Sequence, residues 1–168
     1  MSLKIIHTAD WHLGQTFFGY DRDEEHEAFL SWLIDILTLR QTDVLLIAGD
    51  VFDVANPSAA AQRRFFRFLR EANRRNPQLQ IVIIAGNHDS AARLEAPIPL
   101  LEELNTSIVG AVPRTDLCKI DFDSLLIPLY NKEGKREAIC LAVPYLRQGD
   151  YPLRKKGKDI RLVEGVTR

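Results

Sequence analysis

Cysteine and histidine are both scarce in this sequence of 168 residues, which contains two cysteines and four histidines. The cysteines, Cys118 and Cys140, do not have the spacing of a CxxC pair. We therefore expect two reduced core thiols in an intracellular protein rather than a disulfide.

Long apolar runs and an excess of one charge are also absent. No apolar stretch approaches the roughly 18 residues that a membrane-spanning helix needs, and no signal-peptide pattern precedes His7. The formal net charge is −1, so no global basic field demands a nucleic-acid partner, although a local basic patch would suffice for one. The length suits no more than one domain, and we expect a soluble cytoplasmic protein with no membrane partner.

Apolar residues are present in the pattern of an α/β protein. Short apolar runs predict buried strands, and apolar residues at helical spacing predict helices between them. The expected strands are 3–8, 44–48 and 81–84, and the expected helices are 22–40, 57–76 and 90–104. The last helix is expected to be irregular near Pro97 and Pro99. This alternation favours a parallel sheet. Shorter strands are expected at 107–109, 117–122, 124–130 and 137–143, with a hairpin turn at 131–135.

Polar side chains follow each of the first three expected strands. Asp10 and His12 follow the first strand, Asp50 the second, and Asn87 and His88 the third. Ligands of parallel sheets bind at the carboxyl ends of the strands, so we expect these side chains to meet at one edge. A lone strand-end aspartate is usually a turn residue, and only the combination over three strands indicates a site.

The chemistry of these side chains suits divalent metal ions. Carboxylate, imidazole and amide donors together favour Mn²⁺, Fe²⁺ or Zn²⁺ over a thiolate-bound ion. Asp50 follows Gly49, where the backbone turns sharply, and its two oxygens could bridge two ions. His88 would face the same cleft as a proton donor. Asp53 would either hold His88 in position or cap the turn before Pro57.

The motifs D-x-H, G-D-x-x-D and G-N-H-D resemble those of the calcineurin-like metallophosphoesterase superfamily, whose domain is an αββα sandwich. The surrounding segments "HTADWHLG", "AGDVFDVANPS" and "AGNHDS" resemble the SbcD-type family of DNA repair nucleases. That resemblance implies hydrolysis of DNA ends and hairpins in double-strand-break repair and recombination. It also implies two divalent metal ions, most commonly Mn²⁺, and a partner ATPase of the SMC-like SbcC type.

The same resemblance implies a role for each motif residue. Asp10, His12, Asp50 and Asn87 would be metal ligands, with Asp50 bridging, and His88 would be the catalytic histidine. The family completes its site with histidines from later motifs, whereas the last histidine here is His88. We therefore expect the chain to be the first half of the sandwich, and to bind metal weakly and hydrolyse little by itself.

Two alternatives to the nuclease stay open at this point. One is another calcineurin-like phosphoesterase, and the other is a non-catalytic half-domain scaffold. If the second half is absent, the strands at 81–84 and 124–130 should also lack a cover for part of their apolar surface.

The expected helix at 57–76 carries an unusually wide apolar face. Phe65, Phe66, Phe68 and Leu69 fall within five positions, which is more than one sheet-facing stripe needs. The resembling family dimerises through helices of this region. We therefore expect a homodimer through the helices at 57–76 and 90–104.

Overall fold

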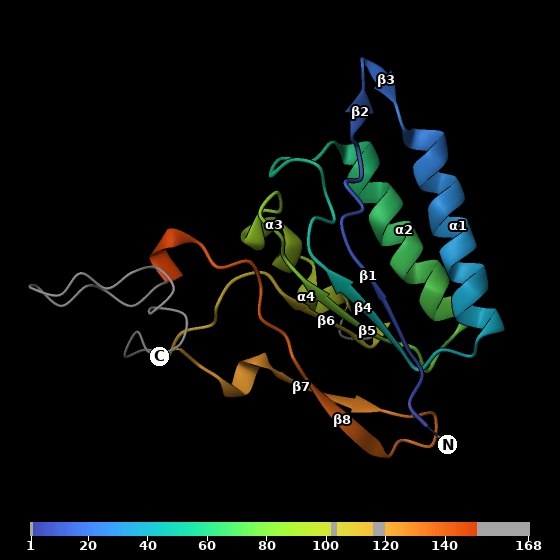
Figure 1. Cartoon of the computed structure of the whole chain (residues 1–168), viewed down its shortest axis with the longest axis vertical. Helices are drawn as coiled ribbons and strands as arrows, with labels where there is room; N and C mark the ends of the chain where they lie inside the picture. The colour runs from blue at the N-terminus through green and yellow to red at the C-terminus, as the bar shows by residue number, and fades with distance from the viewer. Residues whose placement is uncertain (1, 102–103, 116–119, 151–168) are drawn as a thin grey trace, which may run out of the picture.

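A four-stranded parallel sheet forms the centre of the protein, in a computed structural model that describes residues 2–101, 104–115 and 120–150 (Figure 1). The strands lie in the order β1 (Ile5–Thr8), β4 (Val44–Ala48), β5 (Gln80–Ile84) and β6 (Thr106–Val109). The expected parallel α/β arrangement is confirmed, and every neighbouring pair of strands runs in the same direction.

Two long helices connect the strands. They are α1 (Asp23–Leu39) and α2 (Ala59–Arg75). The helix α2 begins after Ser58, whose hydroxyl accepts a hydrogen bond from the Ala61 N–H at 3.1 Å. Among the described residues, no helix is long and apolar enough to cross a membrane.

The helix expected over 90–104 is instead two short helices, α3 (Ala91–Glu95) and α4 (Ile98–Leu101). The break falls at Ala96 and Pro97. Proline has no N–H to continue the helical hydrogen bonds, so they are interrupted at Pro97, although Ala96 itself keeps a helical backbone. The irregularity expected near Pro97 is therefore a complete break between two helices.

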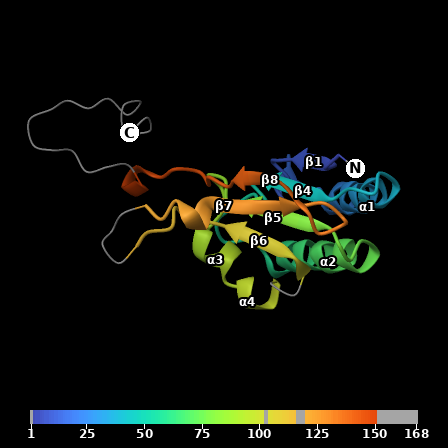
Figure 2. The ribbon, with the colours of Figure 1, turned by 90° about the horizontal axis from the view of Figure 1, so that it is seen from below.

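The two faces of the sheet have different covers. Side chains of α1 and α2 pack with Leu45, Ile81 and Ile108 on one face, in the larger apolar core. The other face is covered by the hairpin of β7 (Leu126–Tyr130) and β8 (Arg136–Leu141), which lies in front of the sheet in Figure 2. The protein thus has a helical layer, a parallel sheet and a second β layer.

The second β layer covers the strand at 81–84, which was expected to lack a cover for part of its apolar surface. Val82 of β5 is 2% exposed and packs against Leu129, so β5 has a cover on both faces. The Gln80 side chain fixes the hairpin there, because it donates to the Pro128 carbonyl at 2.8 Å and accepts from the Tyr130 N–H at 3.2 Å. Only outward-facing residues of β7 and β8 stay exposed, among them Leu126, Tyr130, Ile139 and Leu141.

The expectation of reduced core thiols concerns one residue that the structure describes and one that it does not. Cys140 of β8 is a partly buried free thiol, and its burial raises the pKa of the thiol. Cys118 and most of the strand expected at 117–122 lie outside the described residues.

A small hairpin that the sequence did not predict extends beyond the start of α1 (Figure 1). It consists of β2 (Thr16–Phe17) and β3 (Tyr20–Asp21). Phe18 and Gly19 form its turn with φ of 50° and 82°, the positive values that the tightest hairpin turns require. Two residues per strand are too few to give a periodic signal.

The wide apolar face of α2 is mostly used inside one copy of the chain. Phe65, Phe68 and Leu69 are buried in the core, and Phe66 is partly buried and packs against it. Phe65 contacts Trp11 and Phe52, with ring centroids 6.3 and 5.4 Å apart. The face therefore gives little support to a dimer by itself, and the dimer stays a prediction.

We predict that Phe65→Ala lowers the free energy of unfolding by about 3–5 kcal/mol, because it leaves a cavity among three aromatic rings. The matched control is Phe18→Ala, since Phe18 is 87% exposed, and it should change the stability by less than about 0.5 kcal/mol. Urea denaturation of the purified variants measures both. Equal stability of the two variants would contradict this account of the core.

Candidate metal centre

The loops after β1 and β4 run side by side at the carboxyl edge of the sheet. The N–H groups of Asp10 and His12 donate to the carbonyls of Gly49 and Asp50, at 3.1 and 2.9 Å. Leu13 N–H likewise donates to the Val51 carbonyl at 2.9 Å. These bonds hold the first two motifs in a fixed register.

Three of the predicted metal ligands have a left-handed backbone. The φ values are 56° at Asp10, 45° at His12 and 47° at Asp50. Residues other than glycine adopt this region at a cost of about 1–2 kcal/mol each. Such strain persists only where the surrounding structure imposes it, and it is most frequent at functional sites.

The loop after β5 approaches Asp50 closely because of two glycines. Gly49 has a φ of 87°, and a Cβ added to it would lie 3.0 Å from the Cα of Gly86. A Cβ added to Gly86 would overlap the backbone nitrogen and the carboxylate of Asp50. The close approach lets the His88 N–H donate to Asp50 Oδ1 at 2.9 Å.

Asp89 joins the loops after β4 and β5, a role that was not predicted from the sequence. The residue is 1% exposed, and its carboxylate accepts three backbone hydrogen bonds. The donors are the N–H groups of Val51 at 3.2 Å, Phe52 at 3.0 Å and Gly86 at 2.9 Å. Its place directly after His88 in "GNHD" was the signal available in the sequence.

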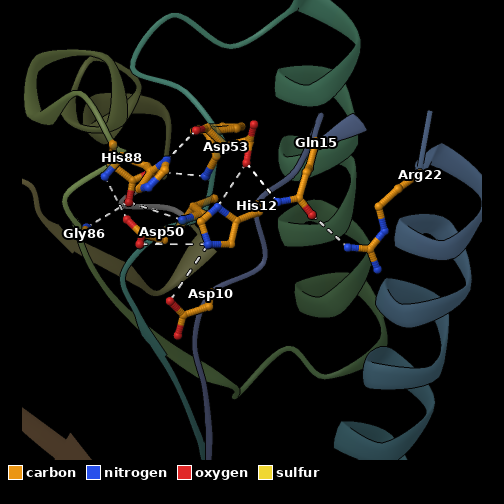
Figure 3. Close-up of polar contacts among 11 residues, drawn as sticks. Asp10, His12, Gln15, Arg22, Asp50, Asp53, Gly86 and His88 are labelled. Atoms are coloured by element: carbon orange, nitrogen blue, oxygen red, sulfur yellow. Dashed lines mark hydrogen bonds and ion pairs between the residues drawn. The ribbon is translucent and has the colours of Figure 1, made fainter. Parts of the chain in front are cut away.

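The side chains of the motifs converge on His12 (Figure 3). His12 Nε2 lies 4.0 Å from both Asp10 Oδ1 and Asp50 Oδ2. On the other side of the ring, His12 Nδ1 lies 3.2 Å from Asp53 Oδ1 but makes no hydrogen bond of good geometry. The His12 ring thus lies among three carboxylates, and one of its buried nitrogens has no hydrogen bond. This combination of imidazole and carboxylate ligands fits a divalent cation.

Two overlapping groups of side chains could each hold an ion. The first contains Asp10, His12 and Asp50, and the second contains His12, Asp53 and His88. Within each group the potential ligand atoms all lie within 4.8 Å of one another. Asn87 is exposed on the turn between Gly86 and His88, so all of the predicted site residues lie on the same three loops.

His88 is held by the backbone of Asp53. Its Nδ1 lies 2.6 Å from the Asp53 carbonyl oxygen, and the two imidazole rings of His12 and His88 are 4.9 Å apart. The hydrogen bond to that carbonyl raises the pKa of His88, and the nearby carboxylates of Asp50, Asp53 and Asp89 act in the same direction. A proton on Nδ1 is therefore stabilised.

The carboxylate of Asp53 points elsewhere than the sequence suggested. It lies toward His12 and accepts a hydrogen bond from Gln15 Nε2 at 3.3 Å. Gln15 in turn accepts from Arg22 at 2.8 Å, which connects the site to the start of α1. The helix α2 is capped by Ser58. No local pattern in the sequence marks Gln15.

Comparison with known proteins agrees with this geometry. The family model for calcineurin-like phosphoesterases matches residues 3–159. The chain is 48% identical over 165 residues to the SbcD component of the nuclease SbcCD from Rhodobacter capsulatus, covering 98% of the chain and 40% of that protein. It is 34% identical over 155 residues to the corresponding Escherichia coli K12 protein, covering 92% of the chain and 36% of that protein. For the corresponding Bacillus subtilis protein the identity is 40% over 122 residues, covering 73% of the chain and 31% of that protein. The chain thus spans well under half the length of these relatives.

We predict that Asp89→Asn lowers Mn²⁺ affinity by about 10–100-fold, the usual effect of losing a group that orients metal ligands. The amide has one acceptor oxygen, so at least one buried N–H loses its partner, which costs about 1–3 kcal/mol of stability. Isothermal calorimetry and urea denaturation measure the two effects. Asp123→Asn, at an exposed position, is the control, and unchanged Mn²⁺ affinity in Asp89→Asn would contradict the assigned role.

Proposed function

This chain belongs to the calcineurin-like phosphoesterase family, and from that membership we propose that it forms part of a metal-dependent DNA nuclease. The family implies binding of divalent metal. The observation that carries the proposal is the group of Asp10, His12 and Asp50, whose ligand atoms lie within 4.8 Å of one another, with His88 of a third loop beside His12. The relatives named as components of a nuclease support a nucleic-acid substrate over a small phosphate ester.

The proposed roles of the residues follow from their positions. Asp10, His12, Asp50 and Asn87 would bind the ions. Asp50 would be shared, because it follows β4, which lies between β1 and β5, and its carboxylate faces His12. When bound, such ions activate a water molecule and neutralise charge on the phosphate. We propose two ions, with Mn²⁺ as the physiological metal.

His88 is proposed as the proton donor to the leaving oxygen. Its Nδ1 is held by the Asp53 carbonyl, so Nε2 is the nitrogen that can face a substrate. The hydrogen bond that raises the pKa of His88 also keeps the ring protonated at higher pH. The carboxylate of Asp53 would act on His12 rather than on His88, since it lies 3.2 Å from His12 Nδ1.

The finer features of the function are proposals as well. We propose DNA ends and hairpins as substrates, with exonucleolytic and endonucleolytic cleavage in break repair and recombination, and hence a cytoplasmic location. The relatives are named as one component of a nuclease called SbcCD, which supports a second component, and we propose an SMC-like ATPase of the SbcC type.

A homodimer through α2, α3 and α4 is the remaining proposal on partners. Its support is now the partly buried Phe66 and the resemblance of the motifs, since three of the four expected interface residues lie in the core. A non-catalytic half-domain scaffold stays the alternative proposal. The expectation that these 168 residues alone hydrolyse little stays a prediction.

We predict that Asp50→Asn abolishes Mn²⁺-dependent cleavage of duplex DNA ends in the intact protein without unfolding it. The substitution keeps an oxygen for the His88 N–H but removes the charge that would serve both ions. A gel assay of end-labelled DNA measures the loss, with Asp123→Asn as the matched control. Cleavage at near the wild-type rate would contradict the assignment of Asp50 as a shared metal ligand.

We predict that His88→Ala lowers kcat by about 10²–10⁴-fold, the range typical of a lost general acid. Mn²⁺ affinity should change little, because Nδ1 is already occupied by the Asp53 carbonyl. Single-turnover kinetics and calorimetry separate the two effects. If Mn²⁺ affinity falls with the rate, His88 is a metal ligand instead.

A further inference from the structure

The segment after β8 returns to the edge of the sheet that carries the metal centre. The Ala142 N–H donates to the Leu125 carbonyl, and the Tyr145 N–H donates to the Ala85 carbonyl, both at 2.8 Å. Ala85 directly precedes Gly86 of the loop after β5. Figure 1 shows this orange-to-red segment passing from β8 toward α3.

Arg147 lies at the point where this segment meets the site. One of its guanidinium nitrogens donates to the backbone carbonyl of Asp89 at 2.7 Å, one residue beyond His88. The guanidinium also lies over the ring of Tyr145, 5.8 Å from its centroid. A backbone anchor and an aromatic face together fix the plane of this exposed cation.

In the described part of the chain, the guanidinium of Arg147 forms no ion pair with a carboxylate. Asp150 accepts from the backbone N–H of Arg147 at 2.7 Å, and its carboxylate lies 3.9 Å from Arg114. Other arginines are paired with acids, for example Arg22 with Glu25, Arg64 with Asp23 and Arg75 with Asp35. Arg147 is therefore a fixed cation whose nearest polar partner is a neutral carbonyl.

We propose that Arg147 binds a backbone phosphate of the DNA strand, next to the phosphate that is cut. The inference rests on the proposed nuclease function and assigns one contact within it. A guanidinium has five N–H donors in a planar fork that matches phosphate oxygens, and the bond to Asp89 uses one of them. The carboxylates of Asp10, Asp50 and Asp53 repel a polyanion, and Arg147 offsets that repulsion beside the proton donor.

Three variants of Arg147 in the intact protein separate the effect of its charge from the effect of its hydrogen bond to the Asp89 carbonyl. Arg147→Ala removes both, Arg147→Gln keeps an amide that can donate to the Asp89 carbonyl, and Arg147→Lys keeps the charge. The matched control is Arg136→Ala, which removes an exposed arginine at the first residue of β8. Calorimetry with Mn²⁺ should give wild-type affinity for every variant, which checks that the site is intact.

DNA binding is measured by fluorescence anisotropy of a labelled duplex in EDTA, between about 50 and 200 mM NaCl, the range over which phosphate contacts respond. Arg147→Ala and Arg147→Gln should each bind about 5–10-fold more weakly at low salt, with the slope of log K against log salt reduced by about 0.9, the value for one phosphate. For Arg147→Lys, the slope of log K against log salt should stay close to that of the wild type. In Mn²⁺, Arg147→Ala should raise KM for DNA more than it lowers kcat.

Two results would overturn the inference. Wild-type affinity and slope in Arg147→Gln would mean that the side chain only tethers the segment, and a slope unchanged in Arg147→Ala would mean that it contacts no phosphate. The nuclease proposal fails separately, if the wild-type protein with Mn²⁺ cleaves no DNA. A slope that depends on Arg147 would still support the phosphate contact in that case.

Discussion

The buried carboxylate of Asp89 is the constraint on which the arrangement of the site depends. A carboxylate that is removed from water is tolerated only if its oxygens are hydrogen-bonded, and here three backbone N–H groups satisfy it. Two of those groups belong to the loop after β4 and one to the loop after β5. The same side chain therefore fixes the distance between Asp50 and His88, and the bond from His88 N–H to Asp50 follows from it.

The apolar core also holds the motif loops in place, through buried aromatic rings next to the site residues. Trp11 lies between Asp10 and His12 in the sequence, and Phe52 directly precedes Asp53. Both rings point into the core, where Trp11 contacts Phe68 at 5.1 Å and Phe52 contacts Phe65 at 5.4 Å between centroids. Each loop thus places a buried aromatic ring directly beside the side chains proposed as ligands. Burial of the rings offsets the left-handed backbone strain of Asp10, His12 and Asp50.

Most elements of the fold could be read from local pattern. The strand at 44–48 has the bounds that its apolar run predicts, and the long helices α1 and α2 differ from the predicted ranges by one or two residues at each end. Buried parallel strands and amphipathic helices repeat within a few residues, so periodicity reports them well. The strands of the β2–β3 hairpin have two residues each, which is too short for periodicity to detect.

The sequence by itself determined which residues reach the edge of the sheet, because strand order and the carboxyl-end rule place Asp10, His12, Asp50, Asn87 and His88 there. Only the tertiary structure decided how they meet. His88 bonds to the carbonyl of a residue 35 positions away, Asp89 to backbone 38 and 37 positions away, and Arg147 to a carbonyl 58 positions away. Backbone groups are alike at every residue, so a bond to a distant carbonyl or N–H leaves no mark in local composition. It exists only once the sheet, its helices and its second β layer have brought those loops together.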